Sequence, residues 1–209
     1  MTDKEDNQIT GFYPGAMSKA PDYSLLDLKQ KPDFVIISPN DPQAIIKLSQ
    51  ECRNLNIPFM IDIGMQLPAL DQQQIRDTLK GAKILIGNDY EIDLLKTKAS
   101  LTEADLFNEV EIIITTLGAK GSIIQTKDEK IEVSAAKTSQ VFDPTGAGDA
   151  YRAGFICGFQ KGLPLKTCGQ MGAIASCYTI EKYGTTSHTF SKDVFRARYS
   201  ENFQEELNI

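Results

Sequence analysis

The sequence predicts an α/β protein with a doubly wound, mostly parallel β-sheet. Short runs of β-branched and other apolar residues recur, and an amphipathic stretch of helical length separates each run from the next, which is typical of buried parallel strands. Asp41 before Pro42, and later Asp71, supply the capping residues that start such helices. This alternation predicts a sheet covered by helices on both faces. The four runs are residues 34–37, 59–63, 84–86 and 112–115.

The second half of the chain changes pattern. Two short apolar runs flank a charged turn and predict an antiparallel hairpin, and three longer stretches with helical spacing follow. No linker or repeat interrupts the chain, so we expect one domain over residues 1–209. The hairpin strands are residues 122–125 and 130–133, and the helices are residues 147–161, 165–183 and 192–206.

The composition excludes several classes of function. The 209 residues are 41% hydrophobic and 24% charged, with a net charge of -6. This suits a globular core but not the basic face that binding to nucleic acid or to an anionic membrane requires. The first residues are acidic and polar, unlike a secretory signal, and no apolar run approaches the roughly 20 residues that span a bilayer. We expect reduced core thiols in a cytoplasmic protein, because metal-ligand spacing is absent from Cys52, Cys157, Cys168 and Cys177.

The strongest chemical signal is the run D-P-T-G-A-G-D-A at residues 143–150, directly before an apolar helical stretch. Small residues that open a helix leave its first amide groups pointing outward, and glycines let phosphate oxygens approach these amides closely. Asp149, just inside this anion site, is placed to take a proton from an attacking hydroxyl. The alternative is a helix N-terminus whose aspartate only complements the helix dipole.

The same eight residues resemble the C-terminal signature of the ribokinase (PfkB) superfamily of carbohydrate and nucleoside kinases. Three further segments extend the resemblance to nearly the whole chain and resemble the bacterial adenosine kinase-like branch: D-N-Q-I-T-G-F-Y-P-G-A-M at 6–17, I-E-K-Y-G-T-T-S-H at 180–188 and F-R-A-R-Y-S-E-N-F at 195–203. The resemblance implies a ribokinase-like three-layer α/β/α fold and transfer of phosphate from ATP to a sugar or nucleoside hydroxyl. It also implies that Asp149 is the catalytic base and that the amides of Gly146, Ala147 and Gly148 form the anion hole.

A second motif, N-D-Y-E, follows the third predicted strand at residues 88–91. By itself it has the spacing of a helix capping box, in which Asn88 accepts a backbone hydrogen bond and Glu91 reaches back to the cap amide. The superfamily uses the same N-x-x-E pair to organise magnesium, water and the nucleotide phosphates. Both roles can coexist in one pair of side chains.

A third motif, T-L-G-A-K-G, lies directly after the fourth predicted strand at residues 116–121. Its G-x-x-G spacing alone predicts a tight connection to the hairpin. It also resembles the nucleotide loop of the superfamily, whose backbone lies along the ribose and phosphates of ATP. The resemblance therefore implies ATP contacts from Thr116, Gly118 and Gly121.

A stretch of small residues around positions 172–184 predicts a closely packed helix with a glycine C-cap at Gly184. In the superfamily this helix flanks the adenine, which implies contacts from Ala175 and Tyr178, and the loop after it encloses a monovalent cation. The single histidine, His188, receives no catalytic role, because a lone histidine is more often structural. The resemblance implies a potassium site, formed mostly by carbonyl groups, at Asp143, Thr145, Thr179, Lys182, Gly184 and His188.

The beginning of the chain departs from the superfamily. Residues 8–12 have the pattern of a strand, yet no strand precedes them to pair with. The acidic sugar contact, the Gly-Gly motif and the lid with which family members begin have no counterpart before Thr10. We therefore expect a chain that lacks the N-terminal strands and lid, transfers phosphate poorly, and self-associates through an exposed sheet edge.

These observations favour an ATP- and Mg²⁺-dependent phosphotransferase, with the 5'-hydroxyl of adenosine as the acceptor of the intact protein. The sequence leaves the acceptor open among adenosine, ribose and other sugars. An alternative is a non-catalytic fragment that binds a nucleotide or a partner chain. An NAD-dependent oxidoreductase is disfavoured, because a G-x-G-x-x-G fingerprint followed by a helix is absent.

Overall fold

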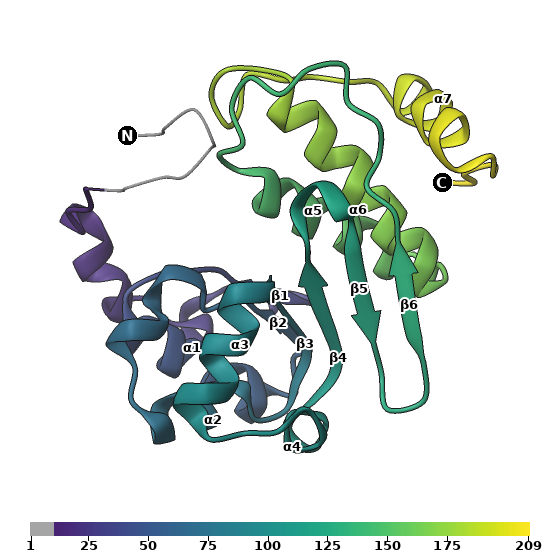
Figure 1. Ribbon diagram of the computed structural model, residues 1–209. Helices are drawn as coiled ribbons and strands as arrows, with labels where there is room; N and C mark the ends of the chain where they lie inside the picture. The colour runs from purple at the N-terminus through teal and green to yellow at the C-terminus, as the bar shows by residue number, and fades with distance from the viewer. Residues whose placement is uncertain (1–10) are drawn as a thin grey trace. The chain divides into compact units, whose positions relative to one another are not determined.

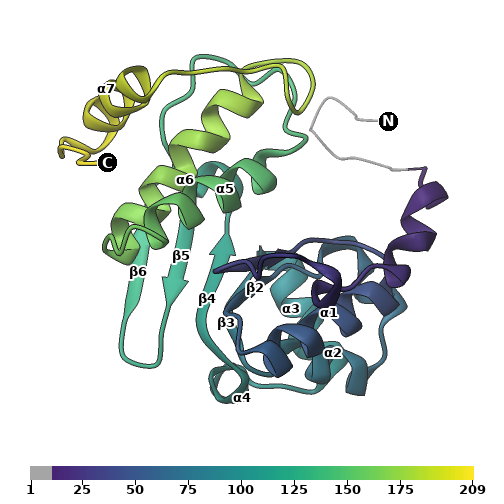
Figure 2. The same cartoon turned by 180° about the vertical axis from the view of Figure 1, so that it is seen from behind.

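The computed structural model describes residues 11–209, which form two compact units (Figures 1 and 2). The first unit runs to Thr115 and includes Gln125–Glu129, and the second comprises Thr116–Ile124 and Lys130–Ile209. Over the described residues, the strands follow the order β1-β2-β3-β4-β5-β6 in one six-stranded sheet. The chain order of the strands is therefore also their order in the sheet.

Strands and helices alternate through the first unit, as predicted. Strand β1 pairs with β2, and β2 with β3, in parallel, with Val35 opposite Phe59 and Met60 opposite Ile84. Each of the four predicted apolar runs is a strand, with shifts of one or two residues at its ends. The strands are β1 (Val35–Ile37), β2 (Phe59–Ile61), β3 (Ala82–Asn88) and β4 (Val110–Thr116). The helices are α1 (Pro42–Leu55), α2 (Gln72–Leu79), α3 (Asp89–Ala99) and α4 (Glu103–Glu109).

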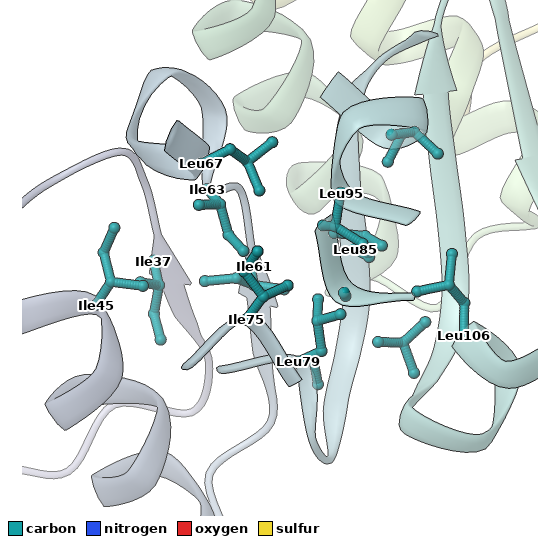
Figure 3. Close-up of a cluster of buried hydrophobic side chains, with 14 of the residues drawn as sticks. Ile37, Ile45, Ile61, Ile63, Leu67, Ile75, Leu79, Leu85, Leu95 and Leu106 are labelled. Carbon is teal, nitrogen blue, oxygen red and sulfur yellow. The ribbon is translucent and has the colours of Figure 1, made fainter. Parts of the chain in front are cut away.

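The core of the first unit forms where the helices cover the strands. Its central side chains are almost fully buried and come from β2, β3 and α2, as Figure 3 shows. Asp41 caps α1 by accepting a hydrogen bond from the Gln43 amide, and Asp71 begins α2 with a capping box. Both predicted helix starts are confirmed.

Three features of the first unit differ from the sequence prediction. The run at 59–63 leaves the strand at Ile61, because the chain turns into a 3₁₀ helix at Gly64–Ala69. Helix α4 was not predicted, although Thr102 and Asp105 form a capping box at its start. Of the strand predicted at residues 8–12, positions 8–10 lie outside the described residues, and positions 11 and 12 are not in a strand.

The second unit contains two short strands, a 3₁₀ helix at Gly118–Lys120 and three α-helices. Figure 1 shows β5 and β6 running in opposite directions, which confirms the predicted hairpin. Helices α5 and α6 approach closely because α5 has a glycine at position 154: a Cβ there would lie 2.6 Å from the Met171 carbonyl oxygen. The elements are β5 (Ser122–Gln125), β6 (Lys130–Val133), α5 (Ala147–Phe159), α6 (Leu165–Ile180) and α7 (Lys192–Phe203).

Two predictions for the second unit were wrong in detail. Helix α6 ends at Ile180 with Glu181 as its C-cap, so Gly184 is not the cap, although its φ of +82° is in the left-handed region. All four cysteines are free, but Cys157 is exposed on α5 and is not a core thiol. Among the described helices, none is long and apolar enough to cross a membrane.

Candidate functional site

The first turn of α5 has the open geometry that the D-P-T-G-A-G-D-A run predicts. Gly146, the N-cap residue, has a φ of +83°, which favours glycine, and provides no side chain to cap the helix. A Cβ added to Gly148 would meet no atom within 4 Å, so the turn lies at an open surface. The backbone N–H groups at such a helix start form a ready site for an anion.

Asp149 stands at the edge of this turn and pairs with an arginine of the same helix. Its carboxylate is 70% exposed and accepts a hydrogen bond from the guanidinium of Arg152. The Arg152 side chain is only 8% exposed, and burial lowers its pKa, although a guanidinium remains charged in proteins. A buried cation thus orients an exposed carboxylate. Sequence reasoning missed Arg152, although its i,i+3 spacing from Asp149 was a signal.

Three of the residues predicted to form a cation site meet where the loop before α5 contacts the segment after α6. The carboxylate of Asp143 accepts hydrogen bonds from the amides of Thr145 (3.0 Å) and Gly184 (3.1 Å). The pKa of Asp143 is lowered, mainly by a hydrogen bond from the Thr145 side chain and then by these two amide hydrogen bonds. The amide of Asp143 in turn donates to the Ile180 carbonyl (3.3 Å). The loop before α5 is therefore tied to the segment that follows α6.

The other predicted cation-site residues lie around the end of α6. Thr179 Oγ1 lies 3.5 Å from His188 Nε2, and the Lys182 amide donates to the Thr179 carbonyl (3.2 Å). A Cβ on Gly146 would lie 3.5 Å from the Thr179 methyl group, so Thr179 borders the first turn of α5. No three His, Cys, Asp or Glu side chains cluster as metal ligands within residues 11–209. The oxygen groups at this corner are the Asp143 carboxylate, the Thr179 hydroxyl and backbone carbonyls.

The T-L-G-A-K-G loop in the second unit is a compact, self-bonded turn. The Leu117 amide donates to the Gly121 carbonyl (2.8 Å), and the Gly121 amide donates to the Gly118 carbonyl (3.0 Å). Both glycines have positive φ, and a Cβ on Gly118 would meet nothing within 4 Å. At Gly121 a Cβ would lie 2.0 Å from the Val133 carbonyl oxygen, which excludes every other residue type. The loop thus exposes backbone at one end and is fixed on β6 at the other.

The two residues predicted to flank adenine lie in packed surroundings. Ala175 is buried against α5. A Cβ added to Gly154 of α5 would lie only 3.0 Å from the Ala175 Cβ. Tyr178 stacks on Phe190 with 4.4 Å between the ring centroids, and the Arg198 guanidinium lies 4.7 Å from the Tyr178 ring centroid. Ala175 therefore packs between two helices, and an aromatic neighbour covers one face of the Tyr178 ring.

Asn88 and Glu91 belong to the first unit, where β3 ends and α3 begins. Asn88 Oδ1 accepts from the Glu91 amide (2.8 Å), and Glu91 Oε2 accepts from the Asn88 amide (2.8 Å), so the capping box is formed in full. A Cβ on Gly87 would lie 3.3 Å from Glu91 Oε2, so the capping carboxylate lies close to the Gly87 backbone. Structurally the capping interpretation is confirmed, and the role in nucleotide binding stays a prediction.

Other side chains that shape the second unit were not predicted from sequence. Ser176 Oγ of α6 donates to the Ala147 carbonyl (2.8 Å) and so holds the first turn of α5. Glu181 accepts hydrogen bonds from Arg198, Thr138 and the Ser139 amide, and these bonds fix the segment that leads toward Asp143. No local spacing reveals these contacts, because the partners are far apart in the sequence.

Two surface cavities in the first unit lie away from all predicted site residues. A cavity of about 650 Å³ is lined by the end of α3 and the start of α4, including Lys96 and Ser100. A cavity of about 380 Å³ lies at the N-terminal ends of β2, β3 and β4, including Cys52 and Lys83.

Known proteins resemble this chain over almost its whole length. Residues 1–192 match the family described as pfkB family carbohydrate kinase. A nucleoside kinase of Methanocaldococcus jannaschii is 35% identical over 198 residues, which cover 93% of this chain and 64% of that protein. A nucleoside kinase of Methanothermobacter thermautotrophicus is 33% identical and covers 90% of this chain and 61% of that protein. The chain thus spans less than two thirds of the length of either relative.

Solved structures give the same result for the fold. Burkholderia thailandensis nucleoside kinase in complex with inosine superimposes with a TM-score of 0.95 and 29% identity, over 99% of this chain and 69% of that chain. The M. jannaschii nucleoside kinase, an archaeal member of the ribokinase family, gives a TM-score of 0.88 and 31% identity, over 96% of this chain and 66% of that chain. The predicted ribokinase-like, three-layer α/β/α fold with a mostly parallel sheet is confirmed.

Proposed function

Because the chain belongs to the pfkB family of carbohydrate kinases, we propose that it forms the nucleotide-binding and catalytic part of an ATP-dependent nucleoside kinase. The observation that carries this proposal is the first turn of α5, where Gly148 leaves the backbone open and Asp149 projects beside it. Phosphoryl transfer needs an anion site and a positioned base more than it needs covalent chemistry. This turn supplies both.

In the proposed reaction Asp149 accepts the proton of the acceptor hydroxyl. The hydroxyl oxygen forms a bond to the γ-phosphorus of ATP, the bond from that phosphorus to the bridging oxygen breaks, and ADP leaves with the electron pair. The amides of Gly146, Ala147 and Gly148 donate hydrogen bonds to the phosphoryl oxygens, where negative charge gathers in the transition state. For this the Ala147 amide gives up the hydrogen bond that it donates to the Pro144 carbonyl (3.2 Å). Arg152 keeps the carboxylate of Asp149 in one orientation.

The T-L-G-A-K-G loop is proposed to lie along the ribose and phosphates of ATP. The exposed backbone at Gly118 supports this proposal. A Cβ added there would meet no atom within 4 Å, so the space beside the loop is open to a ligand. Gly121 fixes the position of the loop, because its contact with the Val133 carbonyl admits no side chain. Thr116 contributes the polar group that precedes the turn.

Asn88 and Glu91 are proposed to organise Mg²⁺ and water. Mg²⁺ is usually held by one or two carboxylates together with waters and phosphate oxygens. Glu91 fits this requirement, because the capping box uses one carboxylate oxygen, Oε2, and the carboxylate has a second. When bound, Mg²⁺ supplies positive charge that stabilises the phosphate oxygens.

A monovalent cation, potassium, is proposed to bind at the corner formed by Asp143, Thr179 and the segment after Gly184. Support comes from the hydrogen bonds that bring Asp143, Thr145 and Gly184 together and from the position of Thr179 beside Gly146. A cation there would stabilise the loop that leads into the anion site. The lowered pKa of Asp143 keeps its carboxylate ionised, which favours a cation nearby.

The acceptor is proposed to be a purine nucleoside, with the 5'-hydroxyl of adenosine as the reacting group. Support comes from two observations on relatives: the similar archaeal proteins are named nucleoside kinases, and the similar Burkholderia structure contains inosine. Transfer of labelled phosphate from ATP to adenosine, inosine, cytidine and ribose, measured side by side, ranks the acceptors. A preference for ribose over the nucleosides would contradict this assignment.

Binding of ATP with Mg²⁺, measured by isothermal titration calorimetry, tests the proposed site directly. Gly148→Val places a branched side chain over the open turn and should weaken binding by at least about 10-fold, since a phosphate must approach these amides closely. Ala153→Val is the matched control, because it adds the same side chain at an exposed position of the same helix. Equal ATP affinity in the two variants, or no ATP binding by the unaltered protein, would overturn the proposal.

A further inference from the structure

A buried hydrogen bond joins the two segments of the second unit to which ATP binding is assigned. Ser122 directly follows the T-L-G-A-K-G loop, and Tyr151 follows Asp149 on the next turn of α5. Ser122 Oγ and the Tyr151 hydroxyl are 2.7 Å apart, and the two residues are 2% and 5% exposed. The bond therefore lies in the interior, where water does not compete for it.

Each end of this bond is attached to its segment with little freedom. On the loop side, Gly121 is fixed against the Val133 carbonyl, and the Leu117 amide donates to the Gly121 carbonyl. Ser122 is therefore the first residue beyond a rigid turn. A shift of the Ser122 backbone must move the turn, because the two are directly joined through Gly121.

On the helix side, the Tyr151 ring is held between α5 and α6. A Cβ on Gly172 would lie 3.0 Å from two ring carbons of Tyr151, and a Cβ on Gly169 would lie 3.2 Å from its hydroxyl oxygen. Phe155 stacks on the same ring, with centroids 6.4 Å apart. The ring therefore packs closely against α6 at Gly169 and Gly172, which holds its hydroxyl near the start of α5.

We propose that Ser122 and Tyr151 are a pair of positioning residues that sets the T-L-G-A-K-G loop and the α5 anion site at the spacing that one ATP molecule requires. The inference rests on the proposed function, because it concerns the same nucleotide. Neither side chain touches ATP in this proposal; both act through the backbone segments that they join. Burial raises the pKa of Tyr151 to about 12, so its hydroxyl keeps its proton at neutral pH.

Titration calorimetry with ATP and Mg²⁺, combined with thermal unfolding, tests the pair. Tyr151→Phe and Ser122→Ala should each weaken ATP affinity about fivefold, and the double variant should be no weaker than either single variant, because both changes break one interaction. Tyr199→Phe is the matched control: Tyr199 is also buried in the second unit and donates its hydroxyl to Gln170, away from both segments. It should lower the melting temperature comparably while ATP affinity changes by less than about twofold.

The outcomes separate this inference from the proposed function. If the unaltered protein binds ATP and Tyr151→Phe lowers only the melting temperature, as Tyr199→Phe does, the bond is structural and the inference fails while the proposed function stands. Fully additive losses of affinity in the double variant also refute the pair. If the unaltered protein does not bind ATP, the proposed function fails and the inference fails with it. Should Tyr151→Phe not fold, Ser122→Ala alone, compared with Tyr199→Phe, decides.

Discussion

The ion pair between Glu181 and Arg198 should control the acid stability of the second unit. Glu181 accepts two hydrogen bonds from the Arg198 guanidinium, at 2.8 and 2.5 Å, and one each from Thr138 and the Ser139 amide, both at 2.9 Å. The two charged side chains are 15% and 16% exposed. Such a carboxylate is held ionised, and its pKa is lowered to about 2, mainly by the hydrogen bonds from Arg198.

The size and sign of the effect follow from this pKa. The ordinary value is 4.5, and each unit of difference between the folded and unfolded states corresponds to about 1.4 kcal/mol, so Glu181 contributes on the order of 3 kcal/mol. Because the folded-state pKa is the lower one, this stabilisation is complete above pH 4.5. It is lost progressively as the pH falls from 4.5 toward 2. Glu181→Gln removes the titrating group and therefore this part of the pH dependence.

Urea unfolding followed by circular dichroism between pH 2.5 and 7 measures the effect. Glu181→Gln should be less stable by about 2 to 3 kcal/mol at pH 7, and the difference from the unaltered protein should shrink toward zero at the acid end. Other carboxylates also titrate in this range, so the difference between the two proteins is the relevant quantity. Asp193→Asn is the control, because its pair with Arg196 is exposed and should contribute less than about 1 kcal/mol. A difference that stays constant across the whole pH range would refute the reasoning.

Three further predictions concern the site and the thiols. Asp149→Asn should lower the rate of phosphoryl transfer by at least about 100-fold and change ATP affinity little, because a positioned base is lost; near-normal turnover would exclude Asp149 as the base. Potassium should raise ATP affinity or the transfer rate through the Asp143 corner, and equal values in potassium and in a bulky organic cation at matched ionic strength would contradict the cation site. Ellman's reagent should label Cys157 rapidly in the native protein, because it alone is exposed. More than one fast thiol would contradict the burial of Cys52, Cys168 and Cys177, where burial raises the pKa.

The strands and helix starts could be predicted because their causes are local. Buried strands need β-branched and apolar runs, and Asp41 and Asp71 cap the backbone within three residues of their own positions. Helix α4 had the same kind of local signal in Thr102 and Asp105 and could have been predicted from it. The C-cap assigned to Gly184 was wrong for the opposite reason. Its amide donates to Asp143, which is distant in the sequence, and Glu181 ends the helix instead.

In the candidate site too, local features could be predicted from the sequence and contacts between distant residues could not. The anion-binding turn of α5 is made by backbone groups, and its open geometry follows from glycines that can be read directly from the sequence. The side chains that hold this turn are a different matter, because Tyr151 and Ser176 bind partners on other elements. Only a folded chain reveals such pairs.

This division has a consequence for how the site tolerates change. Backbone amides cannot be deleted by substitution, so the anion site is most sensitive to changes that add volume at Gly146 or Gly148 or that shift α5. The helix is held at its start by Ser176, through the Ala147 carbonyl, and one turn later by Tyr151, through Ser122. Loss of either contact leaves the amides in place on the helix but alters where they point. Substitutions at these buried residues should therefore affect the nucleotide more than their distance from it suggests.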